Sequence, residues 1–161
     1  MNIFYLDNDP NIAAIWMTDR HVVKMILESA QMLSTAHRIL GINPSDKLYK
    51  STHVNHPSNK WIRESVSNYK WLFYHFKSLG AEYEYRYGRI HKSIQVLSYD
   101  LEQIPCNMPL AAATLIPCAM PTEYIISDDP VKNYRNYYTH GKAHLHKWTG
   151  RQPPEWLYIS K

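Results

Sequence analysis

The segment Asp19–Leu40, taken as a helix, carries a carboxylate, an amine and an imidazole on one side. At about 100° per residue, five polar side chains of this segment fall within a stripe of roughly a quarter turn: His21, Lys24, Glu28, Gln31 and Thr35. The opposite side is apolar, with Val22, Val23, Ile26, Ala30, Leu33 and Leu40. An acid and two possible bases along one line are typical of an active-site helix, although some ordinary helices carry the same pattern.

Capping and helix-breaking residues around this segment predict where its helices begin and end. Asp9-Pro10 predicts an N-cap followed by a proline at the first helical position, with a short helix to about Met17. Thr18 or Asp19 then begins the striped helix, which Gly41 and Asn43-Pro44 end near Leu40. Residues 41–57 lack periodicity and are predicted to form a loop.

Apolar spacings of three and four residues predict further helices. A long helix is expected from Ser58 to about Gly80 or beyond, and Gly88 separates it from another over about 90–101. Four prolines between Pro105 and Pro121 leave room only for a short buried helix at 110–116.

The last part of the chain repeats the cap-and-proline signal. Asp129-Pro130 predicts a helix to about Tyr138, Gly141 precedes a segment over 142–148, and residues 151–158 read as an aromatic, non-helical tail. No convincing strand alternation occurs. We therefore expect an all-α fold, a compact single-domain bundle of about five to seven helices over residues 1–161.

Composition sets the class of protein and its partners. The chain has a formal charge of +4 and is 13% aromatic, which suits a nucleic-acid or nucleotide partner as readily as a tyrosine-rich core with solvated lysines. Two cysteines without Cys-x-x-Cys spacing indicate neither a disulfide framework nor a cysteine zinc site. No export signal or membrane span is apparent, so we expect a soluble cytoplasmic protein without a membrane partner. The oligomeric state is not indicated.

Three groups of residues resemble the pyrimidine-dimer DNA glycosylases, also called phage endonuclease V, which are compact all-α enzymes of similar length. The first is Asp-x-His followed two turns later by Glu, here Asp19, His21 and Glu28. The others are the run Tyr69 to His75 followed by Glu82 and Arg86-Tyr87-Gly88, and the aromatic tail Pro154 to Tyr158. The runs Asp-x-His-Val-Val-Lys-Met and Asn-His-Pro also resemble a closer group of phage proteins, which implies no particular activity.

The resemblance implies a DNA glycosylase and lyase that excises a damaged or modified base in DNA repair, with no cofactor. Glu28 would be the carboxylate that stabilises positive charge at C1′, and Glu28 or His21 would be the base for strand cleavage. The family's nucleophile is the α-amine of a small second residue, whereas residue 2 here is Asn. The Met1 amine, Lys24 in its place, or no imine chemistry at all remain as alternatives. The arginines that flank the family's glutamate are replaced by Leu27 and Gln31.

A flipped base needs a pocket of rings and amides and a cationic approach. The candidates for substrate binding are Asn2, Arg20, Gln31, Asn55, His56, Trp61, Arg63, Tyr134, Arg135, Tyr138 and Trp156. Each also has a structural interpretation, because rings such as Trp61 and Tyr134 commonly belong to a core and Arg135 commonly pairs at the surface.

Two other classes of function remain open. In one, His53-x-x-His56 with His140, His144 and His146 would form a metal site with Asp19 or Glu28, as in a metal-dependent phosphohydrolase. Against it, His53-x-x-His56 lies in the predicted loop and no His-Glu-x-x-His motif occurs, so no residue is predicted to bind a metal. The third class is a non-catalytic protein that binds nucleic acid or a host protein.

Overall fold

The protein is built from α-helices of very different lengths and a few shorter helical turns. The computed structural model describes residues 1–159. Its α-helices in chain order are α1 (Pro10–Ile15), α2 (Asp19–Leu40), α3 (Pro57–Trp61), α4 (Val66–Tyr87), α5 (Lys92–Glu102), α6 (Pro130–Asn136) and α7 (Trp156–Ile159). Shorter helical turns are η1 (Thr122–Tyr124), η2 (Tyr137–Gly141, a π-helix) and η3 (Ala143–Leu145). These residues contain no strand, so the all-α prediction is confirmed.

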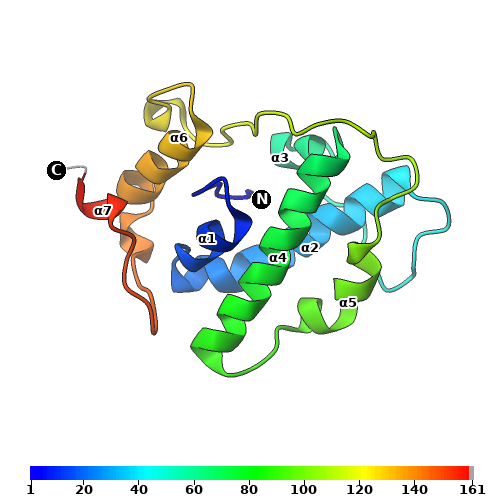
Figure 1. Cartoon of the computed structure of the whole chain (residues 1–161), viewed down its shortest axis with the longest axis horizontal. Coiled ribbons are helices and arrows are strands. Elements are labelled where there is room, and N and C mark those ends of the chain that lie inside the picture. The colour runs from blue at the N-terminus through cyan, green and yellow to red at the C-terminus, as the bar shows by residue number, and fades with distance from the viewer. Residues whose placement is uncertain (160–161) are drawn as a thin grey trace.

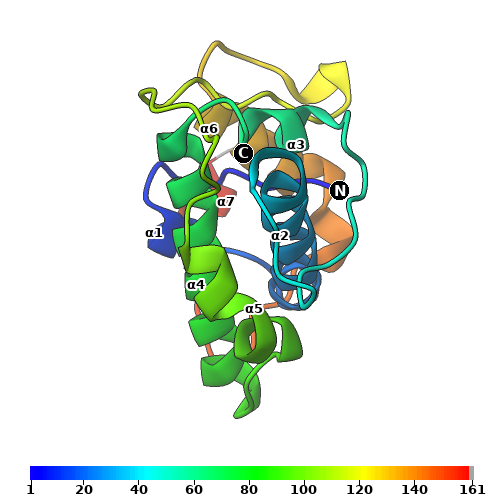
Figure 2. The same cartoon turned by 90° about the vertical axis from the view of Figure 1, so that its right-hand side faces the viewer.

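Two 22-residue helices form the centre of the fold. In Figure 1, α4 crosses in front of α2, with α5 at one end of the pair and α6 and α7 at the other. α4 packs against α1, α2 and α5. Figure 2 shows α4 to one side of α2 and the loop of residues 41–56 along the other. In Figure 1 the N-terminal segment lies between α6 and α4, and Figure 2 shows its first residues at one side of the molecule.

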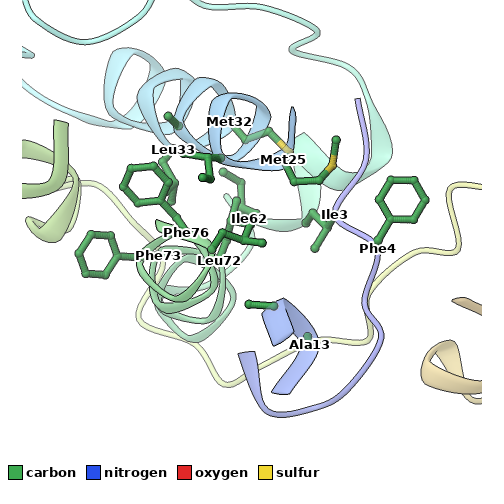
Figure 3. Close-up of a cluster of buried hydrophobic side chains, with 14 of the residues drawn as sticks. Ile3, Phe4, Ala13, Met25, Met32, Leu33, Ile62, Leu72, Phe73 and Phe76 are labelled. Atoms are coloured by element: carbon green, nitrogen blue, oxygen red, sulfur yellow. The ribbon is translucent and has the colours of Figure 1, made fainter. Parts of the chain in front are cut away.

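One core of apolar side chains joins the central helices to the first residues of the chain. Met25, Met32 and Leu33 of α2 meet Leu72 and Phe76 of α4 there, and all are at most 1% exposed. Figure 3 shows Ile3 pointing toward this cluster, whereas the ring of Phe4 lies on the opposite side of the N-terminal segment. The chain's beginning is thus held by core packing.

The long helix expected from Ser58 is wrong in one respect, because it is interrupted at residues 62–65. The Ser65 side chain accepts a hydrogen bond from the Asn68 backbone N–H and restarts the helix as α4. Asn68 Nδ2 donates to the Trp61 carbonyl oxygen at 2.8 Å, which holds the end of α3 against the new start. α4 then continues without a break through Gly80 to Tyr87.

Two further expectations for the second half of the chain are wrong. Residues 110–116 form no helix, and Leu110 is 92% exposed. Pro109 and Pro117 bracket the segment and its alanines offer little apolar area, so nothing stabilises a buried helix there. The tail contains the four-residue helix α7, which begins at Trp156 after Pro154.

One position of α2 also differs from the expected pattern. Val23, placed by periodicity on the apolar side of α2, is 41% exposed.

A buried network of charges ties the start of α2 to α4 and to the C-terminal tail. Arg86, whose side chain is fully buried, donates to Glu82 Oε1 at 2.8 Å and to Asp19 Oδ1 at 3.0 Å. Arg151 donates to both Glu82 oxygens at 2.9 Å. Asp19, Glu82 and Arg86, three residues of the family resemblance, are therefore structural here. Within residues 1–159, no helix is both long and apolar enough to traverse a bilayer.

Candidate active site at the N-terminus and α2

The carboxylate of Glu28 gathers three nitrogen donors. The Met1 amine lies 3.9 Å from Glu28 Oε2, and the Asn2 backbone N–H donates to the same oxygen at 3.0 Å. Lys24 Nζ lies 3.3 Å from Oε1, one helical turn before Glu28. The side chain of Glu28 is 12% exposed and that of Lys24 is 61% exposed. The carboxylate is thus nearly buried, with an amine on each side.

The main chain of Met1 is partly exposed even though its side chain is anchored in the protein. The Met1 side chain packs against the core and is only 2% exposed. Because the residue as a whole is half-buried, its exposed part is the main chain, which carries the amine. A buried side chain and an accessible main chain are what a fixed terminal nucleophile requires.

Asn2 fixes the position of this terminus. Its Nδ2 donates to the Ala119 carbonyl oxygen at 2.8 Å, and its Oδ1 accepts from the Tyr134 hydroxyl at 3.1 Å. Tyr134 is fully buried, and its hydroxyl also bonds to the Pro117 carbonyl oxygen. Asn2 and Tyr134, both predicted to bind substrate, instead bond to each other and hold the first residues of the chain.

His21 lies beneath the same segment. Its ring stacks on Phe4 with centroids 4.2 Å apart, and its Nδ1 lies 2.8 Å from the Tyr138 hydroxyl. Burial, and then the positive charges of Lys142 and Lys24, lower the pKa of His21 to about 3. So weak a base accepts a proton poorly at neutral pH. His21 and Tyr138 position the N-terminal segment.

Phe4 is a site residue that sequence reasoning missed. Its backbone has a φ of +56°, an uncommon conformation for a bulky side chain. The turn sends Ile3 and Phe4 to opposite sides of the segment, so that both are buried. The apolar run Ile3-Phe4 was the available signal that the terminus is anchored.

His56 approaches the site from the loop before α3. Its Nδ1 accepts from the Ser58 backbone N–H at 3.2 Å and so caps α3. Burial, and then the charge of the terminal amine and of His53, lower the pKa of His56, while Glu28 acts in the opposite direction. His56 therefore lies close enough to the terminal amine and to Glu28 for their charges to act on it. Asn55 beside it is exposed, and Gln31, three residues after Glu28, is half-buried.

Other predicted substrate residues serve the fold. Trp61 is 3% exposed and donates from Nε1 to the Thr114 carbonyl oxygen at 3.0 Å. Arg63 donates to the carbonyl oxygens of Asn59 and Val54 and so holds the loop that carries His56.

Arg135 and Trp156 lie together in the C-terminal part of the fold. Arg135 pairs with Asp7 at 2.9 Å, and its guanidinium lies 4.8 Å from the ring of Trp16 and 5.5 Å from that of Trp156. Ion pairing and ring stacking account for these two side chains without a substrate. Arg20 is exposed near the start of α2.

Four hollows lie in the surface, and Glu28 is not among the residues that line them. Among residues 1–159, no group of three or more His, Cys, Asp or Glu side chains is placed to hold a metal ion. Cys106 and Cys118 are both free thiols. The arrangement of the site is therefore that of amines around one carboxylate.

Comparison of the chain with models of protein families, with curated proteins and with solved structures found no match.

Proposed function

We propose that the protein is a DNA-processing enzyme of the glycosylase and lyase type, which excises or processes a damaged or modified base. The observation that supports this function best is the position of the Met1 amine, 3.9 Å from Glu28 Oε2, with its main chain on the exposed side of the residue. Residues 1 and 28 are far apart in the sequence, and burial of the Met1 side chain keeps them together.

The amine and the carboxylate divide the chemistry between them. The amine nitrogen attacks C1′ of the target nucleotide, the bond from C1′ to the base breaks, and the base leaves with the electron pair and a proton. Glu28 stabilises the positive charge at C1′. The sugar ring then opens as the C1′–O4′ bond gives its electrons to the oxygen, which takes a proton, and an imine remains.

Strand cleavage follows from the imine. Glu28 removes a proton from C2′, the C3′–O bond breaks, and the phosphate leaves with its electron pair. Water then hydrolyses the imine and frees the amine. An α-amine suits this role because such groups are intrinsically less basic than a lysine side chain.

Lys24 is the competing nucleophile, and its geometry favours another role. Its ammonium group lies 3.3 Å from Glu28 Oε1, which leaves Oε2 to the Met1 amine and the Asn2 N–H. Lys24 thus balances the carboxylate from the solvent side. The arginine variant of this residue keeps that charge and removes the primary amine.

Borohydride trapping tests the proposal. The protein is incubated with duplex DNA that carries an abasic site, or ultraviolet-induced dimers, and the reduced adduct is mapped by peptide mass spectrometry. We expect an adduct on the α-amine of Met1, retained in Lys24→Arg and lost in Glu28→Gln. An adduct on Lys24 would assign the chemistry to that residue, and DNA binding without any adduct would support the non-catalytic alternative.

A further inference from the structure

A basic hollow lies beside the first turns of α2. It has a volume of about 540 Å³, and its cations are Arg20 and Lys24 of α2 and Lys147 of the segment after η3. The Asp19 backbone N–H donates to the Lys147 carbonyl oxygen at 2.9 Å, which fixes the two walls relative to each other. Figure 1 shows the start of α2 at the end of the molecule where the C-terminal segments lie.

The one carboxylate in the lining does not cancel these charges. Asp19 Oδ1 accepts from Arg86 at 3.0 Å and from the Thr149 backbone N–H at 2.8 Å, and Oδ2 accepts from the Thr149 hydroxyl at 2.7 Å. Its charge is thus matched by the buried network. Among the ion pairs of residues 1–159, neither Arg20 nor Lys147 has a carboxylate partner.

More cations lie near His21 in the first turn of α2. After burial, the charges that lower the pKa of His21 are those of Lys142, Lys24, Arg20 and His144, which come from α2 and from the η2–η3 region. A concave surface with several like charges and low-dielectric walls concentrates the field that attracts an anion. The geometry of the hollow therefore suits a group with several negatively charged oxygens.

We infer that the basic hollow binds a backbone phosphodiester of the DNA strand whose neighbouring sugar lies at Glu28. This inference rests on the proposed function for the position of that sugar. Arg20, Lys24 and Glu28 follow one another at four-residue intervals, so they lie along one line of α2 with about 6 Å of rise between them. A DNA strand that runs along this line places one phosphate at Arg20, the next at Lys24 and a sugar at Glu28.

The chemistry of the cations fits a phosphodiester. The planar guanidinium of Arg20 matches two phosphate oxygens at once, and Lys147 adds a flexible point charge from the opposite wall. Lys24 lies between the hollow and the active site and contacts Glu28 directly. Phosphate binding and catalysis are thereby coupled through one side chain.

Salt-dependent binding tests this inference with a probe that cannot react. The probe is a fluorescent duplex with a tetrahydrofuran abasic analogue, which lacks the aldehyde needed for an imine. The dissociation constant is measured by anisotropy over a series of salt concentrations for the double variant Arg20→Gln/Lys147→Gln. The matched control is Lys47→Gln/Lys92→Gln, which removes the same charge from exposed positions at the α5 end of the molecule.

We expect the slope of log affinity against log salt to fall by about 0.9 in the Arg20/Lys147 variant, the value for one lost phosphate contact, and much less in the control. Equal slopes in the two variants would overturn the inference even if trapping of abasic DNA persists. Binding to phosphatidylserine vesicles but not to the duplex would also overturn it. A protein that forms no adduct yet shows the slope difference loses the proposed chemistry and keeps the phosphate site.

Discussion

The backbone N–H of Asn2 donates a 3.0 Å hydrogen bond to Glu28 Oε2, the oxygen that also faces the Met1 amine. A peptide N–H does not titrate, so this bond persists whether the amine is charged or neutral. Glu28 therefore stays oriented when the amine loses its proton, which is the state that imine formation requires. The first peptide bond of the chain is part of the candidate site.

Asn2→Ala tests whether the amine must be held in place. The substitution removes the bonds of the Asn2 side chain to the Ala119 carbonyl oxygen and to Tyr134. We expect a loss of about 1–2 kcal/mol in the free energy of unfolding, measured with urea. The rate of adduct formation at saturating DNA should fall, while the dissociation constant for DNA stays unchanged. Asn8→Ala, at an exposed position, is the control and should alter neither.

The buried histidines predict how stability depends on pH. Burial lowers the pKa of His21 from 6.5 to about 3 and that of His75 to about 4. Acid therefore protonates the unfolded chain before the folded one. Stability is complete above about pH 6.5, decreases as the pH falls toward about 3, and loses nothing further from these groups below that range.

His21→Phe isolates one of these protons. The new ring keeps the stack on Phe4 and removes the group that titrates. Between about pH 6 and pH 4, the slope of the free energy of unfolding against pH should decrease by about 1.4 kcal/mol per pH unit, the value for one proton. Urea unfolding over a pH series measures it. The same slope in the variant and the natural protein would show that His21 is not buried in its neutral form.

Arg86 should dominate the stability of the α2–α4 junction. Its guanidinium donates to Glu82, Asp19 and the Ile15 carbonyl oxygen, and its side chain is fully buried. Removing one partner from a buried network leaves charges uncompensated, so Arg86→Gln should cost about 3–5 kcal/mol in urea unfolding. Arg89→Gln, at an exposed position three residues later, should change it by less than about 0.5 kcal/mol. An equal loss in the free energy of unfolding for Arg86→Gln and Arg89→Gln would contradict this role of Arg86.

Local signals in the sequence were sufficient for α2. Thr18 and Gly41 flank the helix at its observed ends, and its register alone places Lys24 next to Glu28. The break before α4 depends instead on contacts that no local pattern contains. Asn68 bonds to the Trp61 carbonyl oxygen and to Thr114, which is 46 residues away.

The candidate site was predictable only in part for the same reason. The sequence indicated the carboxylate of Glu28 and the two amines that could act with it. The close approach of Met1 to Glu28 in the folded chain depends on how Ile3 and Phe4 pack. The approach of Lys147 to Arg20 had no sequence signal, because it follows from the folded position of the C-terminal segment.

Extending the chain before Met1 tests the nucleophile without changing any side chain. A Gly-Ser extension replaces the terminal amine by a peptide nitrogen, which cannot form an imine, and keeps the bond from the Asn2 N–H to Glu28. The main chain of Met1 is on the exposed side, so the extension should fit with a change of less than about 1 kcal/mol in stability. The adduct with abasic DNA should then disappear while binding to the tetrahydrofuran duplex persists. Removing the extension with a protease to restore Met1 should restore trapping, and an adduct that survives the extension on a residue other than the new terminal amine would exclude the Met1 amine as the nucleophile.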